Sequence, residues 1–158
     1  MSASEVVRFD MSGPPDAAAF QRLYDSTGWA GGVEREPGFY ARALAGSWVQ
    51  CAAYAGEELV GFGRVISDGV LHAFITEMIV LPVWQGRGLG SQLLDRLVQH
   101  CLQQGLRDIQ LFCAEGKQGF YEKGGFTPRL PGRPGMQYTR CAEASESPIS
   151  PESPASPE

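Results

Sequence analysis

A proline and three closely spaced glycines separate two apolar segments in the middle of the chain, in the run VLPVWQGRGLGS at residues 80–91. The apolar residues 74–81 stop at Pro82, because proline has no N–H to donate and disfavours helix in the residue before it. After Gly90, apolar residues recur at helical spacing as far as Leu102. The pattern predicts a buried strand, a glycine-rich turn and an amphipathic helix, in that order.

The predicted turn has the chemistry of a phosphate-binding site. A helix N-terminus leaves N–H groups unpaired and carries a partial positive charge, and glycines let the backbone approach an anion closely. Arg87 adds a permanent cation. The loop lacks the Gly-Lys-Ser/Thr of a Walker A motif, and its glycine spacing differs from the dinucleotide fingerprint. We expect a pyrophosphate cradle, with a tight turn that binds nothing as the alternative.

The 158 residues predict one folded domain, and no apolar run is long enough to span a membrane. Residues 1–5 lack the features of a signal peptide. Four cysteines are scattered singly beside two histidines, so we expect reduced thiols, no metal site and a cytoplasmic location. Four of the five excess negative charges lie in residues 142–158, so charge gives no reason to expect a nucleic-acid partner.

Turn residues divide the rest of the chain into short elements. Asp68-Gly69 predicts a two-residue hairpin, and Gly61 and Gly63 predict a bulge or a close backbone approach within a strand. We expect a folded domain over residues 1–141, followed by a disordered Ser/Pro/Glu tail over residues 142–158. The expected strands are 6–9, 48–55, 59–67, 70–81, 108–113 and 136–141, and the expected helices are 17–24, 39–44, 89–104 and 115–123.

The order of these elements resembles the GNAT (GCN5-related) N-acetyltransferase superfamily. Two motifs carry the resemblance: EMIVLPVWQGRGLG at residues 77–90, which contains Q-x-x-G-x-G, and GFYEKGGF at residues 119–126, which is like the family's F-Y-x-x-x-G-F. The resemblance covers residues 6–141. It implies an α/β fold with a mixed, mostly antiparallel central sheet flanked by helices, in which a splayed strand pair holds CoA.

The family resemblance also implies a cosubstrate, acetyl-CoA, and no metal. The main chain of the strand before the loop would pair with the pantetheine arm, and the loop would bind the pyrophosphate. The implied cosubstrate-binding residues are Met78, Ile79, Val80, Gln85, Gly86, Arg87, Gly88, Leu89, Gly90 and Ser91.

Two residues are expected to carry the chemistry. Tyr121 takes the family's general-acid position, and a phenol stays protonated at pH 7, so it can protonate a departing thiolate. Glu77 is the candidate base, because a partly desolvated carboxylate is a better proton acceptor; the alternative is a solvated carboxylate or one paired with an arginine. His72 is a second candidate base, although strict strand alternation would place it on the face opposite Glu77. Cys113 could suggest an acetyl relay, but strand cysteines are usually inert.

We therefore expect an N-acetyltransferase whose primary amine substrate, a small molecule or a peptide, attacks acetyl-CoA directly in a ternary complex. A non-catalytic CoA-binding sensor or structural module of the same fold is the alternative, and a longer acyl donor stays open. Residue Tyr24, the loop 28–38 and the loop 127–135 would form the acceptor side, with Trp29, Phe39 and Tyr40 as an aromatic pocket or as core. No nucleic acid or membrane partner is expected, and a homodimer stays an open alternative because dimers are common in the family.

Overall fold

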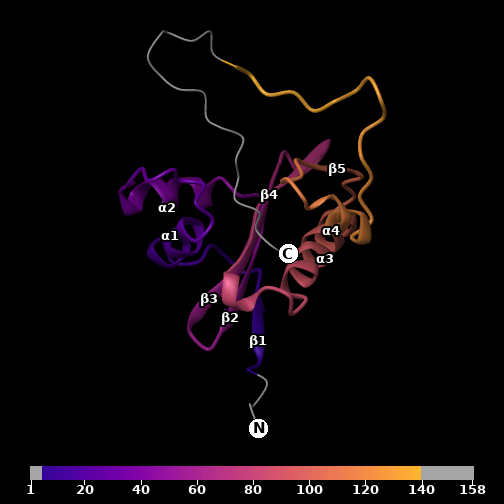
Figure 1. The fold of residues 1–158 in the computed structure, drawn as a ribbon. Helices are drawn as coiled ribbons and strands as arrows, with labels where there is room; N and C mark the ends of the chain where they lie inside the picture. Colours follow the sequence, from indigo (N-terminus) through magenta and orange to yellow (C-terminus); the bar gives the residue numbers. More distant parts are fainter. Residues whose placement is uncertain (1–4, 140–158) are drawn as a thin grey trace.

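The structure is a computed structural model that describes residues 5–139, except for the side chain of Pro37. Five strands and four α-helices make up this part of the chain (Figure 1). In chain order they are β1 (Val7–Asp10), α1 (Ala17–Asp25), α2 (Pro37–Ala45), β2 (Val49–Ala55), β3 (Glu58–Ser67), β4 (His72–Val80), the short 3-10 helix η1 (Pro82–Trp84), α3 (Leu89–Gln103), β5 (Asp108–Leu111) and α4 (Gln118–Lys123).

The strands form one sheet in the order β1-β2-β3-β4-β5. Every neighbouring pair is antiparallel except β4 and β5, which are parallel because α3 crosses between them. Helices α1 and α2 lie on one side of the sheet, and α3 and α4 lie on the other (Figure 1). The expected mixed, mostly antiparallel sheet flanked by helices is confirmed.

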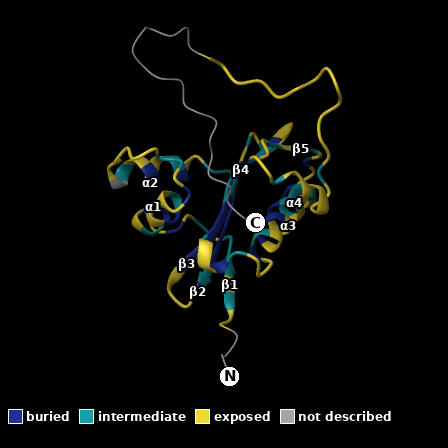
Figure 2. Cartoon of the chain, viewed as in Figure 1, coloured by how far each residue is buried: buried dark blue, intermediate teal, exposed yellow. Residues whose placement is uncertain are grey.

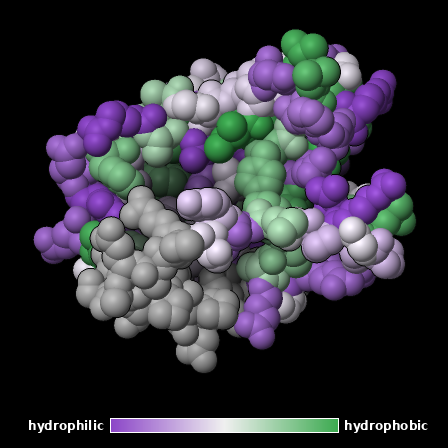
Figure 3. Space-filling view, turned by 90° about the horizontal axis from the view of Figure 1, so that it is seen from above, coloured by the Kyte–Doolittle hydropathy of each residue, from purple (hydrophilic) through white to green (hydrophobic). Residues whose placement is uncertain are grey.

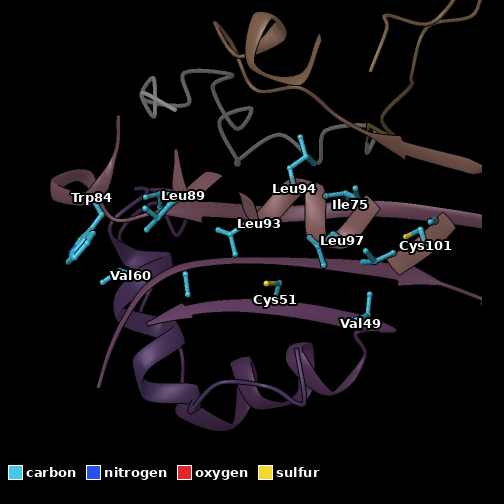
Figure 4. Close-up of a cluster of buried hydrophobic side chains, with 14 of the residues drawn as sticks. Val49, Cys51, Val60, Ile75, Trp84, Leu89, Leu93, Leu94, Leu97 and Cys101 are labelled. Carbon is cyan, nitrogen blue, oxygen red and sulfur yellow. The ribbon is translucent and has the colours of Figure 1, made fainter. Parts of the chain in front are cut away.

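The main core lies between α3 and the sheet. The apolar stripe of α3 packs there as its periodicity predicts, with Leu93, Leu97 and Cys101 fully buried (Figure 4). Gly61 and Gly63 allow this close approach, because a Cβ on either would come within 3.0 Å of a leucine of α3. Burial is concentrated on the central strands and on the helix faces that meet them (Figure 2).

Strand β4 contains a β-bulge. Arg64 of β3 pairs with Thr76 and Phe62 pairs with Ile79, so Glu77 and Met78 together face the single residue Gly63. Glu77 has φ 47°, a conformation that non-glycine residues rarely adopt. The bulge expected within β3 lies on its other edge, where Ala53 pairs with Gly61 and Tyr54 with Leu59. The bulge that contains Glu77 is a second one, with its extra residue on β4.

Strands β4 and β5 diverge before β4 ends. Their pairing stops at Ile75 and Leu111, while β4 continues to Val80. The second half of β4 therefore has no strand partner on the β5 side within residues 5–139, which is the splayed arrangement that the family resemblance implies.

Several elements differ from expectation, and β5 ends at Leu111 rather than at 113. Asp68 Oδ1 accepts from the N–H groups of Val70 and Leu71, so the turn after β3 is longer than a two-residue hairpin and β4 begins only at His72. Helix α4 begins at Gln118 rather than at 115. Residues 136–139 form no strand, because Met136 and Tyr138 are almost fully exposed and have no apolar surface to cover. The rest of that expected strand and the tail 142–158 lie outside the described residues.

Candidate active site

The glycine loop forms the N-terminus of α3. Gly88 is the N-cap residue at φ 79°, and Gly86 also has a positive φ of 73°. A Cβ on either glycine would meet no atom within 4 Å, so open space lies beside the loop. The Arg87 guanidinium lies 4.5 Å from the centre of the buried Trp84 ring, which holds the arginine against the loop. Open backbone and a helix N-terminus together suit a diphosphate.

Gln85 connects this loop to β4. Its side-chain nitrogen donates a hydrogen bond to the main-chain oxygen of Val80 at 2.9 Å. Its side-chain oxygen is buried and has no hydrogen-bond partner within residues 5–139. A buried amide oxygen normally has a partner, so this atom fits a ligand that brings an N–H donor.

A cavity of about 250 Å³ lies where β4 and β5 diverge. Its lining brings together residues from the loop after α1, from β4, from the glycine loop and from α4. They are Trp29, Phe74, Ile75, Thr76, Glu77, Met78, Ile79, Val80, Gln85, Gly90, Phe112, Ala114, Lys117, Phe120 and Tyr121. One cavity therefore contains the candidate acid Tyr121, the candidate base Glu77 and the three residues expected to bind pantetheine, 78–80.

The remaining loop residues lie beside this cavity rather than in it. Gly86, Gly88, Leu89 and Ser91 line a small adjoining pocket that shares Val80, Gln85, Gly90 and Phe120 with the larger one. Arg87 lines neither; it faces the opposite side of the loop, next to Trp84 and Gln92.

Tyr121 lies on α4, half-buried between the rings of Phe120 and Phe126. Burial, and secondarily the nearby Cys113, raise the pKa of Tyr121 to about 12. Its hydroxyl therefore keeps its proton at neutral pH, as a proton donor must.

Glu77 reaches the cavity because of the bulge. Its carboxylate Oε2 lies 2.5 Å from Arg64 Nε, and the two side chains are 21% and 12% exposed. The arginine-paired alternative weighed from the sequence is thus the arrangement found, and it coexists with a position on the cavity wall.

The other reactive side chains of this region lie elsewhere. His72 is at the exposed start of β4, where it pairs with Asp108 at 2.5 Å, and it does not line the cavity. Cys113 lines a separate cavity of about 340 Å³ on the far side of Tyr121. Cys113 is exposed and lies beyond the end of β5 at Leu111, so it is not the strand cysteine expected from the sequence. Partial desolvation still raises the pKa of its thiol, which lowers its reactivity. No group of three or more metal-binding side chains gathers within the described residues.

The residues expected on the acceptor side do not all line the cavity. Trp29 lines the cavity, but Tyr40 is 3% exposed and packs in the core below α1 and α2. The loop 127–135 contributes to the separate cavity beyond Tyr121. Sequence reasoning placed Phe112 beside the acyl pocket but missed Phe74, and the centres of the two rings lie 5.0 Å apart at the cavity. The alternation of Phe74 with the buried Ile75 was the available signal. The face seen from above in Figure 3 is hollowed near its middle, with apolar side chains beside the hollow.

Within residues 5–139, no helix has the length and apolar character needed to cross a membrane. Residues 17–126 match the sequence profile of the acetyltransferase (GNAT) family.

Two relatives and one solved structure illustrate the similarity. The chain is 31% identical over 143 residues to histone acetyltransferase TAP1 of Glycine max, which covers 84% of this chain and 61% of that protein. It is 36% identical over 87 residues to the chloroplastic GCN5-related N-acetyltransferase 3 of Arabidopsis thaliana, and the match covers 55% of this chain and 37% of that protein. It thus spans less than two thirds of either relative. A GNAT-family acetyltransferase structure from Streptococcus pneumoniae has TM-score 0.72 at 25% identity, covering 87% of this chain and 100% of that one.

Proposed function

We propose that this chain, which belongs to the acetyltransferase (GNAT) family, transfers an acetyl group from acetyl-CoA to a primary amine. The observation that carries the proposal is the cavity of about 250 Å³ where β4 and β5 diverge. Glu77 and Tyr121 share its lining with the end of β4 and the glycine loop. A cavity with a few convergent polar groups is the expected form of a small-molecule reaction site.

The loop and the end of β4 suit the polar parts of acetyl-CoA. The N-terminus of α3 would hold the pyrophosphate, because Gly86 and Gly88 leave open space beside the main chain there. The main chain of Met78, Ile79 and Val80 would pair with the pantetheine arm, because no strand in the described part of the chain pairs with β4 on the β5 side beyond Ile75. The unpartnered oxygen of Gln85 would accept from an N–H group of the same ligand.

Acetyl-CoA supplies, when bound, an acetyl group activated as a thioester. An alkylamine is mostly protonated at pH 7 and must lose a proton before it can attack. Glu77 is the carboxylate on the cavity wall, so it would bind the ammonium group and accept that proton, directly or through water. Tyr121, whose pKa is raised to about 12, would hold the proton that the leaving thiolate needs. No residue of the chain would carry the acetyl group, so the amine attacks within a ternary complex.

The acceptor is proposed as a primary amine on a small molecule or a peptide. The soybean relative is described as a histone acetyltransferase, so a lysine peptide belongs in any panel of test amines. A cytoplasmic location and a homodimer stay proposals; the Arabidopsis relative is described as chloroplastic.

Thermal unfolding with and without ligand tests the proposal first. Acetyl-CoA and CoA should raise the melting temperature in proportion to the logarithm of their concentration, and NADPH should not. On the same sample, free thiol should appear from acetyl-CoA when a pooled panel of amines is added. Stabilisation without thiol release across small amines and lysine peptides would favour a CoA-binding sensor. No stabilisation by either CoA species would overturn the proposal.

A further inference from the structure

The bulge in β4 changes the face on which Glu77 lies. Ala73 and Ile75 belong to the core beneath α3, and simple alternation would place Glu77 with them. The extra residue at the bulge instead brings the Glu77 carboxylate to Arg64 Nε at 2.5 Å. Phe62, two residues before Arg64, packs against α1 and α2, so Arg64 lies on that same face.

Arg64 has a second anchor on this face. Its Nη1 donates to the main-chain oxygen of Ala43 at 2.6 Å, in the last turn of α2, and lies 3.5 Å from Ser47 Oγ. The same oxygen accepts from the N–H of Gly46, the C-cap residue of α2, at 3.2 Å. The guanidinium is therefore its second donor, and a cation at a helix C-terminus also interacts favourably with the helix dipole. One guanidinium therefore bridges α2 and the Glu77 carboxylate from a central strand.

We propose that Arg64 is a positioning residue that holds the Glu77 carboxylate at the reacting amine. This inference rests on the proposed function and deepens it. A glutamate side chain has three rotatable bonds, so its carboxylate can take several positions. The planar guanidinium of Arg64 is itself held by the Ala43 oxygen, and its hydrogen bond to Glu77 favours one position of the carboxylate. Displacing a catalytic group by about 1 Å can cost about 100-fold in rate, so the pair should matter for turnover as well as for stability.

The test is a double-mutant cycle on acetyl transfer, with Arg64→Gln, Glu77→Gln and the double variant. Arg64→Gln should lower kcat by about 10–100-fold, with the dissociation constant of CoA changed by less than about 3-fold. In the Glu77→Gln background the same change should lower kcat by less than about 3-fold, because Arg64 acts through Glu77. Arg64→Lys, which keeps the charge, should recover part of the activity.

The matched control is Arg42→Gln on α2, which breaks an ion pair with Glu36, the N-cap residue of that helix. Both partners of that pair are about two-thirds exposed, so kcat should stay within about 2-fold. If Arg64→Gln does not fold, Arg64→Lys replaces it in the double-mutant cycle with Glu77→Gln, and the coupling of the two changes in kcat is measured in the same way.

Fully multiplicative effects of the two changes, or an unchanged kcat in Arg64→Gln, would overturn the positioning role. An unchanged kcat in Glu77→Gln would overturn it as well and leave the transferase proposal standing. Absence of acetyl transfer by the unmodified chain would overturn the proposed function itself.

Discussion

Gln85 donates a hydrogen bond to the main-chain oxygen of Val80 at 2.9 Å, which ties the glycine loop to the last residue of β4. Gln85→Ala removes this bond and the buried oxygen beside it. We expect CoA affinity to fall by about 10-fold, equal to about 1.4 kcal/mol of binding free energy, because one well-placed hydrogen bond contributes about that much. Isothermal titration measures the affinity. Gln99→Ala, on the exposed side of α3, should leave it unchanged; equal affinity in both variants would remove Gln85 from the binding site.

Gly88 and Gly105 have the same backbone conformation at opposite ends of α3. Their φ angles are 79° and 87°, and a Cβ on either would meet no atom within 4 Å. Alanine at either position should therefore cost about 1–2 kcal/mol of folding stability. Only Gly88→Ala should also weaken CoA binding, because its methyl group would occupy space beside the loop. Denaturant unfolding and titration separate the two effects, and an equal loss of CoA affinity in Gly105→Ala would contradict a phosphate site at Gly88.

Tyr121 should act as a proton donor over an unusually wide pH range. Tyr121→Phe should lower kcat by about 10²–10⁴-fold, the usual worth of general acid catalysis. The pKa of about 12 lies above the ordinary value of 10, so the protonated form persists as pH rises through 10. The activity should therefore show no loss near pH 10 that depends on Tyr121. A falling limb near pH 10 that disappears in Tyr121→Phe would contradict this assignment, and Tyr54→Phe on β2 is the control.

Gly63 permits the bulge that carries Glu77. A Cβ at this position would overlap Met78 Sδ and lie 3.0 Å from Leu97 Cδ1. Gly63→Ala should therefore displace Met78, the other bulge residue, and lower both stability and kcat. Gly119→Ala, whose Cβ would meet no atom within 4 Å, is the control and should leave stability unchanged or slightly raised. Unchanged turnover in Gly63→Ala would show that activity does not depend on the bulge geometry.

The local parts of this structure could be predicted from sequence. The proline stop, the glycine spacing and the apolar stripe of α3 act within a few residues of one another, and they placed the loop at a helix N-terminus. Tyr121 and Glu77 were found through motifs, and the fold then placed them on one cavity.

Features that depend on distant contacts could not be predicted in the same way. The pairing of Glu77 with Arg64 follows from a bulge whose position is set by the register of β3 against β4. Whether Tyr40 lies in a pocket or in the core could not be decided from sequence, because the packing of α1 on α2 has no local signature; it lies in the core. The strand expected near residue 136 is not formed, and Met136 and Tyr138 there are exposed. Alternation of apolar and polar residues does not show whether a neighbouring strand or core surface is available for them.

Transfer of a labelled acetyl group is the most direct test of the central claim. Acetyl-CoA labelled in its acetyl carbons would be incubated with the protein and a panel of amines and lysine peptides, and the products weighed by mass spectrometry. We predict a labelled N-acetyl product that forms with the unmodified protein and about 10²–10⁴-fold more slowly with Tyr121→Phe. Tight binding of acetyl-CoA with no labelled product from any amine would contradict the account.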